Sequence, residues 1–184
     1  MSRRLVMQVT VVAALFLADL SSVARAQKTE LPDYPRLNTS RTYRVDPAWP
    51  QRPDGLEWDH VPGVFVDSSQ QVWIFTRTNP SVQIFTTSGR HVRSWGTDLF
   101  GRPHQIKLDH EGNVWVADQG NHCVLKMTPS GKTLLVLGTR GESGDDRLHM
   151  NNPTDMVVSP TGDVFVSDGY ANSRVLHFDK RGRF

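Results

Sequence analysis

An internal repeat is the feature that most constrains the fold of this chain. Three stretches of the sequence align with one another, at residues 63–96, 104–138 and 154–184. Each stretch contains short runs rich in Val, Ile, Phe and Trp that alternate with polar residues, and turns with glycine separate the runs. Alternation with a period of two indicates β-strands, and glycine supplies the positive φ that short hairpin loops need. Repeats of about 40 residues with four short strands are typical of the blades of a β-propeller.

The repeats also correspond at two individual positions. A polar residue precedes the second run of each repeat, and an aromatic residue lies within that run. The polar residues are Asp67, Asp109 and Ser159, and the aromatic residues are Trp73, Trp115 and Phe165. No helical period follows the first 26 residues, and Pro and Gly recur throughout the repeats, which excludes a helical solenoid of similar repeat length. The sequence therefore predicts an all-β fold, a β-propeller of four-stranded blades.

The sequence contains three repeats, which are too few blades to close a propeller. The third repeat ends at Phe184 before its fourth run, and propellers close with roughly four to eight blades. Residues 41–58 are where one further strand is expected, as the outer strand of another blade. An open stack of blades would leave unpaired strand edges and a half-covered apolar face. We therefore expect this chain to be the N-terminal part of a longer protein; the alternative is that several copies assemble to close the ring.

The first 26 residues predict a cleavable signal peptide. Two arginines lie near the start, residues 11–17 form a short apolar run, and residues 24–26 (ARA) have the small residues of a cleavage site. The run is far shorter than the roughly 18 residues that a membrane span needs. We expect cleavage after Ala26, a secreted or periplasmic location and no membrane anchor after cleavage; the alternatives are an anchor or a disordered tail. Residues 27–54 are then an N-terminal extension and residues 55–184 a partial propeller.

Charge and cysteine content narrow the classes of partner. The formal net charge is +2, and the leader accounts for it with three arginines against one acidic residue, Asp19. No basic run remains outside the leader, so nucleic acid is not an expected partner. Cys123 is the single cysteine, so no disulfide can form within the chain. We expect Cys123 to be a buried apolar residue on a strand.

Strand direction predicts where functional side chains gather. In an up-and-down sheet, the start of the first strand and the turn between the second and third strands lie on the same face. Arg77 and Tyr170 lie in such turns of the first and third repeats, and His104 lies just before the first strand of the second repeat. We expect this guanidinium, imidazole and phenol to converge. Other residues on or near this face are Asp118, Asn121, His122, Thr154, Asp155, Asp168 and Asn172.

Each of the three residues also has a purely structural interpretation. Arg77 would pair with a neighbouring acid, Tyr170 would cover the blade with its ring, and His104 would hydrogen-bond a backbone carbonyl and orient the incoming strand. The other histidines show no metal-ligand spacing, and one histidine does not make a zinc site. From the residues alone, the prediction ends at an exported propeller with a candidate site on one face.

At these residues the sequence resembles NHL-type propeller repeats. More narrowly, it resembles the peptidyl-α-hydroxyglycine α-amidating lyase (peptidylamidoglycolate lyase) family over most of residues 63–184. The matching stretches are GVFVDSSQQVWIFTR, RPHQIKLDHEGNVWVADQGNHCVLKM, LLVLGT and NNPTDMVVSPTGDVFVSDGYANSRVLHF. The resemblance implies a six-bladed propeller that cleaves a C-terminal α-hydroxyglycine into a peptide amide and glyoxylate.

The same resemblance implies cofactors and roles. His104 corresponds to the first of three histidines that hold a catalytic zinc, and Arg77 and Tyr170 correspond to an assisting arginine and tyrosine. A structural calcium is implied at the backbone carbonyls of Val64 and Ile106. Three imidazoles leave an open zinc position for a substrate hydroxyl, a phenol can act as general base, and a guanidinium fits a carboxylate.

The chain departs from the family pattern in places. Gln105 and Thr78 stand where glycine is usual, and the cysteines of a family disulfide, expected near Asn151 and Ala171, are both absent. The remaining zinc histidines and an acidic calcium ligand are expected beyond Phe184. Two hypotheses follow. The first is an exported, zinc-dependent lyase with a peptide or small-molecule substrate. The second is a non-catalytic NHL propeller that binds a peptide, glycan or protein at the same rim.

Overall fold

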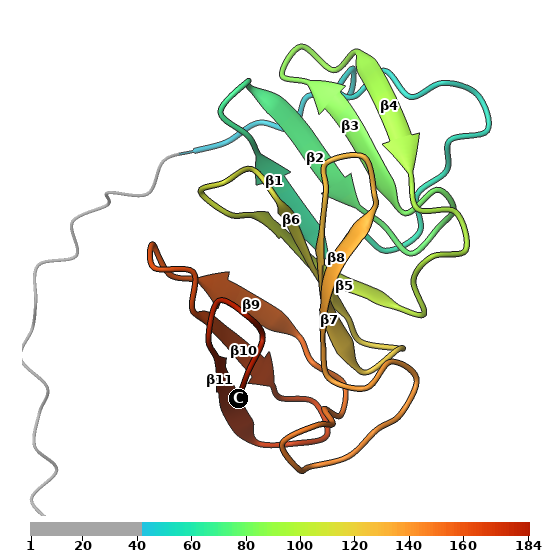
Figure 1. Ribbon diagram of the computed structural model, residues 1–184. Coiled ribbons are helices and arrows are strands. Elements are labelled where there is room, and N and C mark those ends of the chain that lie inside the picture. The colour runs from blue at the N-terminus through green and yellow to red at the C-terminus, as the bar shows by residue number, and fades with distance from the viewer. Residues whose placement is uncertain (1–41) are drawn as a thin grey trace, which may run out of the picture. The chain divides into compact units, whose positions relative to one another are not determined.

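Antiparallel sheets alone make up the regular structure of residues 42–184, which are the residues that the structure, a computed structural model, describes (Figure 1). Residues Arg44–Phe184 form one compact unit. The expected signal peptide, and the extension as far as residue 41, lie outside the described residues. Within residues 42–184 we find no helix of the length and apolarity that crossing a bilayer requires.

The strands form three blades in chain order, each an up-and-down meander with antiparallel neighbours. The first blade is β1 (Gly63–Val66), β2 (Gln71–Phe75), β3 (Val82–Thr86) and β4 (His91–Trp95). The second is β5 (Pro103–Leu108), β6 (Val114–Asp118), β7 (Cys123–Met127) and β8 (Thr133–Leu137). The third is β9 (Asp155–Val158), β10 (Val164–Asp168) and β11 (Arg174–Phe178). The predicted all-β propeller blades are confirmed, while the total of six blades stays a prediction.

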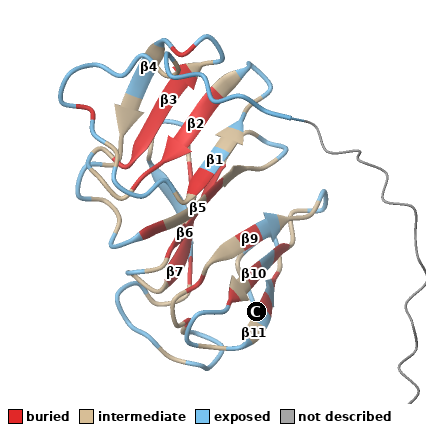
Figure 2. Cartoon of the chain, turned by 180° about the vertical axis from the view of Figure 1, so that it is seen from behind, coloured by how far each residue is buried: buried red, intermediate tan, exposed pale blue. Residues whose placement is uncertain are grey.

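The hydrophobic core lies between successive blades. One cluster joins β2 and β3 to the second blade, with Trp73 and Phe75 packed near Ile106 and Leu125. A second cluster joins the second and third blades in the same way. Every residue of β6 is buried because both of its faces are covered, whereas β10 has one exposed residue, Phe165, and one half-buried residue, Ser167 (Figure 2). The first strands β1, β5 and β9 adjoin one another, so the blades are arranged side by side through their first strands.

An aspartate closes the first hairpin of two blades. Asp109 Oδ2 accepts a hydrogen bond from Trp115 Nε1 at 2.9 Å, and its Oδ1 accepts one from the Asn113 N–H at 2.9 Å. Burial alone would raise the pKa of Asp109, but the hydrogen bonds and nearby Lys126 outweigh this and hold the pKa below its usual value. Asp67 and Trp73 repeat the arrangement at 2.8 Å in the first blade.

The third blade replaces both members of this pair together. Ser159 Oγ accepts the hydrogen bond from the Asp163 N–H at 3.0 Å, and Phe165 has no indole N–H that would need a partner. The two positions that correspond between the repeats are therefore also in contact: the polar residue accepts a hydrogen bond from the aromatic residue in the first two blades, and both residues change together in the third.

The prediction of a further strand within residues 41–58 is wrong for the part that the structure describes, residues 42–58. This segment forms one isolated bridge, from Gln51 to Arg90, and no strand. Three prolines at 47, 50 and 53 remove N–H donors and explain why no ladder forms. The segment instead covers the first blade. Its side chains Trp49, Leu56 and Trp58 pack in one hydrophobic cluster with three residues of that blade, Val72, Ile74 and Phe85.

Cys123 is buried on β7, as predicted. Burial, together with the nearby Asp118 carboxylate, raises the pKa of its thiol to about 12. The thiol is therefore a packed apolar group, because a thiolate at this position is strongly disfavoured.

A double-mutant cycle tests the pairing of Asp109 with Trp115. We expect Trp115→Phe to lower the free energy of unfolding by about 1–2 kcal/mol, because the buried carboxylate loses a donor. Asp109→Ser should cost about 1–2 kcal/mol as well, because the Trp115 indole N–H loses its acceptor, whereas serine can still accept the turn hydrogen bond as Ser159 does. The double variant reproduces the residues of the third blade, and should cost at least about 1 kcal/mol less than the two single losses added. Urea denaturation measures all three, and strict additivity would contradict the pairing.

Candidate functional site

One face of the blades, called here the site face, is formed by the starts of β5 and β9 and by the turns after β2, β6 and β10. Main-chain hydrogen bonds hold these parts together: the Arg77 N–H donates to His60 O, and the Gln119 N–H donates to Arg102 O, each at 3.0 Å. In the third blade the Thr154 N–H donates to Ser167 O at 2.8 Å. In all three blades the entering segment is therefore joined to the end of the second strand, although in the third blade the entering segment is the donor.

His104 occupies an irregular position on β5. Pro103 pairs with Asp118 and Gln105 pairs with Ala117, so His104 is an extra residue without a partner on β6. Such a bulge turns a side chain away from its regular direction, and bulges are frequent beside functional sites. His104 Nδ1 lies 2.6 Å from Thr154 O of the third blade. A carbonyl only accepts, so Nδ1 carries the proton and Nε2 keeps a free lone pair.

Tyr170 lies against this lone pair. Its hydroxyl oxygen is 3.3 Å from His104 Nε2, and the two rings meet edge to face with centroids 5.2 Å apart. The hydroxyl is the donor because Nε2 is the acceptor in this tautomer. Tyr170 is 65% exposed, so the pair is accessible from solvent.

Arg77 adjoins the same segment from the first blade. Its Nε donates to Pro103 O at 3.3 Å, on the residue that precedes His104. The structure thus brings Arg77, His104 and Tyr170 together from three blades. The bond from His104 to the Thr154 carbonyl is the one that the structural interpretation expected, and it leaves Nε2 as an acceptor, here for the Tyr170 hydroxyl.

Several other residues expected on this face have structural partners. Asp118 is fully buried and accepts hydrogen bonds from the Gly101 and Arg102 N–H groups and from Asn121 Nδ2. His122 Nδ1 accepts one from the Asn152 N–H at 3.2 Å. These contacts fix the shape of the turns.

An arginine that sequence reasoning missed fixes the Tyr170 turn. Arg174 Nε donates to the buried Asp168 carboxylate at 2.9 Å, across the base of the turn. Its other nitrogens donate to Asp145 O and to His149 O. Asn172 Nδ2 bonds Asp168 as well, at 2.7 Å. Arg174 therefore ties the Tyr170 turn to the loop that precedes β9, and the pairing of Asp168 with Arg174 in the β10–β11 ladder was the signal available in the sequence.

The loop before β9 carries a histidine with an acidic partner. His149 Nδ1 lies 2.9 Å from Asp146 Oδ1, and its Nε2 lies 3.6 Å from Glu142 Oε2. The hydrogen bond to Asp146, helped by the charge of Glu142, raises the pKa of His149 above its usual value. The charged imidazole is thus the form that stabilises the loop.

A zinc site would take His104 Nε2 as one ligand. A metal-binding histidine normally donates its other ring N–H to a carbonyl or carboxylate, which His104 does toward Thr154 O. Residues 42–184 contain no group of three or more His, Cys, Asp or Glu that could hold a metal ion. His104 therefore fits the chemistry of one zinc ligand, and further ligands would have to come from elsewhere.

The carbonyls of Val64 and Ile106 fit the oxygen ligands that calcium prefers. Val64 faces Ile74 and Ile106 faces Val116 in the ladders. Hydrogen-bonded and non-hydrogen-bonded pairs alternate in an antiparallel ladder, and the turn bond from the Asp67 N–H to Gln71 O places Val64 in a non-hydrogen-bonded pair. The Asp109 N–H to Asn113 O bond does the same for Ile106. Both carbonyls therefore point away from their neighbouring strand.

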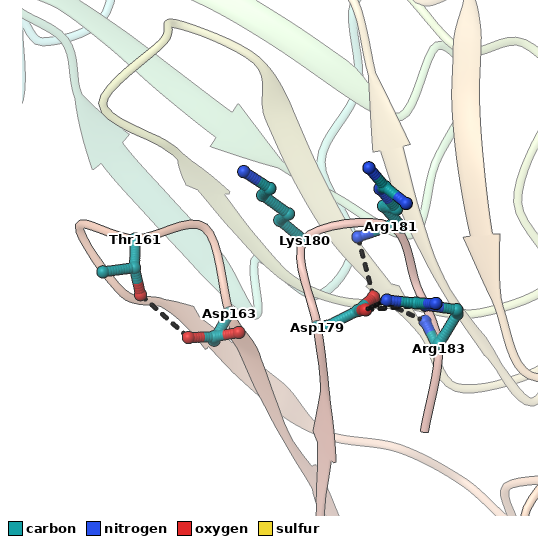
Figure 3. Close-up of a pocket in the computed structure, with 6 residues that line it drawn as sticks. All are labelled: Thr161, Asp163, Asp179, Lys180, Arg181 and Arg183. Atoms are coloured by element: carbon teal, nitrogen blue, oxygen red, sulfur yellow. Dashed lines mark hydrogen bonds and ion pairs between the residues drawn. The ribbon is translucent and has the colours of Figure 1, made fainter.

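An open depression of about 410 Å³ lies elsewhere, among the turns after β9 and β11 (Figure 3). Strand alternation places these turns on the face opposite the site face. The depression is lined by polar residues, which are Thr161, Asp163, Asp179, Lys180, Arg181 and Arg183. The N–H and the side chain of Arg183 lower the pKa of Asp179 to about 2, so this carboxylate is engaged in its own turn.

Comparison with known proteins agrees with the repeats. The NHL repeat family matches residues 100–127 and 150–178, which include His104 and Tyr170. A peptidyl-glycine alpha-amidating monooxygenase of Mus musculus is 47% identical over 96 residues, which are 50% of this chain and 10% of that protein. A probable peptidyl-alpha-hydroxyglycine alpha-amidating lyase of Caenorhabditis elegans is 37% identical over 105 residues, 56% of this chain and 30% of that protein.

A solved structure shares the fold. A chain of the nidogen/laminin complex superposes with a TM-score of 0.54 at 19% identity, covering 67% of this chain and 46% of that chain. Fold and repeats together define the class, an NHL-repeat β-propeller protein. Within that class, the chain is similar to proteins that are named as peptidyl-alpha-hydroxyglycine alpha-amidating lyases. It spans 10% and 30% of the length of the two relatives named above.

Replacing Arg174 tests whether it fixes the Tyr170 turn. We expect Arg174→Gln to lower the free energy of unfolding by about 2–3 kcal/mol, because the buried Asp168 carboxylate loses its charged partner. Arg183→Gln is the matched control: its ion pair with Asp179 is exposed to solvent, so its loss should hardly change the free energy of unfolding. Chemical denaturation measures both. Equal losses in the two variants would show that Arg174 is an ordinary surface arginine.

The pKa of His149 predicts a pH response of the loop before β9. Because the folded pKa is raised, the stabilisation is fully present below about pH 6.5 and is lost as pH rises through the folded value. NMR titration of the imidazole should give a pKa above 6.5 that falls in Asp146→Asn. A pKa that is unchanged by this substitution would exclude Asp146 as the cause.

Proposed function

We propose that this chain is part of an exported, zinc-dependent lyase that cleaves a C-terminal α-hydroxyglycine into a peptide amide and glyoxylate. The observation that carries the proposal is the chain of contacts from Thr154 O through His104 to the Tyr170 hydroxyl, with Arg77 beside it. Homologues that are named as amidating lyases supply the reaction class. The proposed substrate is accordingly a peptide.

The roles follow from the chemistry of each group. Zinc bound at His104 would polarise the hydroxyl of the substrate and lower its pKa. Tyr170 Oη, when deprotonated, takes the hydroxyl proton, and the electron pair of the O–H bond forms the carbonyl of glyoxylate. The C–N bond breaks, and the amide nitrogen leaves with a proton passed on from Tyr170. Arg77 binds and orients the substrate carboxylate. The Thr154 carbonyl keeps the His104 ring in the orientation that the reaction needs.

The experiment assays the purified full-length protein with zinc on a synthetic peptide that ends in α-hydroxyglycine. Glyoxylate and the peptide amide are both measured. We expect Tyr170→Phe to lower kcat about 100-fold or more, because the proton acceptor is lost. Arg77→Gln should mainly raise KM. Ser173→Ala, in the same turn and with an exposed side chain, is the control and should keep wild-type activity.

Two results would overturn the lyase. Absence of glyoxylate with the zinc-loaded wild-type protein rejects the reaction, and full activity of Tyr170→Phe rejects the role of the phenol. Binding of the uncleaved peptide at the site face would instead support the non-catalytic propeller, with Arg77 and Tyr170 as binding residues.

A further inference from the structure

The inner edges of the first strands present main-chain groups without a ladder partner. β1, β5 and β9 pair on one side only, with β2, β6 and β10. Half of their N–H and C=O groups therefore point to the other side, the inner edge of the blades. Val64, Ile106 and Met156 hold the same position on these three strands, each in a non-hydrogen-bonded pair, with Ile74, Val116 and Val166 respectively.

Side chains satisfy the inner N–H groups. The Ile106 N–H donates to Gln105 Oε1 at 3.0 Å, and the Met156 N–H donates to Asp155 Oδ1 at 2.7 Å. On β5 and β9, the residue before the equivalent position thus supplies the acceptor, whereas on β1 that residue is Gly63. The carbonyl groups at the inner edge still lack a ladder partner, and they can accept a hydrogen bond or bind a cation.

Lys107 supplies that partner for the third blade. From β5 of the second blade, its Nζ donates to Met156 O at 2.9 Å and to Asp155 Oδ1 at 2.6 Å. The ammonium group of Lys107 therefore donates to one main-chain carbonyl and one carboxylate. Calcium is bound by oxygens of the same two types. Lys126, by comparison, pairs with the carboxylates of Asp109 and Glu111 and lies 5.5 Å from the centre of the Trp115 ring.

We propose that the Lys107 ammonium group supplies a positive charge at the inner edge of the blades, of the kind that a bound metal ion would otherwise supply. It links the second and third blades through Met156 O and weakens the binding of a divalent cation to the neighbouring carbonyls of Val64 and Ile106. Ile106 and Lys107 are adjacent on β5, so an ammonium and a bound calcium would share one short segment and repel each other. The carboxylate of Asp155, moreover, is already engaged. This inference does not depend on the lyase reaction.

The test measures calcium binding and thermal unfolding of the full-length protein, without any assay of activity. We expect Lys107→Gln to bind calcium at least about tenfold more tightly than wild type in calorimetry, since a like charge is removed. Its melting temperature should fall in EGTA and recover with calcium. Wild type and Lys107→Arg should melt at the same temperature in EGTA and in calcium on the order of 0.1 mM. Lys126→Gln, which removes a lysine from the outer carboxylates, should bind calcium as wild type does.

Each outcome decides the proposal. Equal calcium affinity of Lys107→Gln and wild type, or an unchanged melting temperature in EGTA, overturns it. A Lys107→Gln protein that folds only with calcium supports it. If that variant folds under neither condition, the wild type decides: calcium binding with a Kd on the order of 1 µM overturns the proposal, and a melting temperature insensitive to EGTA supports it.

Discussion

A buried carboxylate at the end of the second strand is the interaction on which the site face depends. Asp118 and Asp168 are fully buried, and each accepts N–H groups from the segment that enters its own blade and from an asparagine of the following turn. An unpaired carboxylate in the interior is costly, so neither the segment nor the turn can move away alone. His104 directly follows one of these segments, and Tyr170 lies in one of these turns.

The proposed site residues also connect the blades. Arg77 of the first blade donates to Pro103 O of the second, and His104 of the second blade donates to Thr154 O of the third. Both reach a carbonyl at the start of the next blade, and Lys107 likewise reaches Met156 O, two residues beyond Thr154. A substitution at Arg77 or His104 therefore affects blade packing as well as any chemistry, which is why kinetic effects need a stability measurement beside them.

The sequence was sufficient for the strands of the three repeats and for the face that they share, because a two-residue period and turn glycines specify an up-and-down meander. It was wrong for residues 42–58, where prolines prevent the expected strand. Alternating strand direction then placed residues 77, 104 and 170 together without further information. The bulge at His104 was not predictable, since it depends on how Pro103 and Gln105 pair with β6. Nor was Lys107, whose partners lie 48 and 49 residues away on another blade. Long-range polar contacts leave no periodic signal in a single sequence.

The departures from the lyase pattern fall where this chain has other contacts. Gln105, at a position where glycine is usual, lies over Gly63, where a Cβ would come within 2.8 Å of the glutamine oxygen. The larger residue on β5 is thus accommodated by the absence of a side chain on β1. The cysteines missing near Asn151 and Ala171 would have joined the loop before β9 to the Tyr170 turn. Hydrogen bonds join the same two segments here, from the Asn151 N–H to Asp168 and from Arg174 to the loop carbonyls. A polar connection of this kind joins the Tyr170 turn to the loop without a covalent bond, and it relies on the buried Asp168 carboxylate keeping both of these partners.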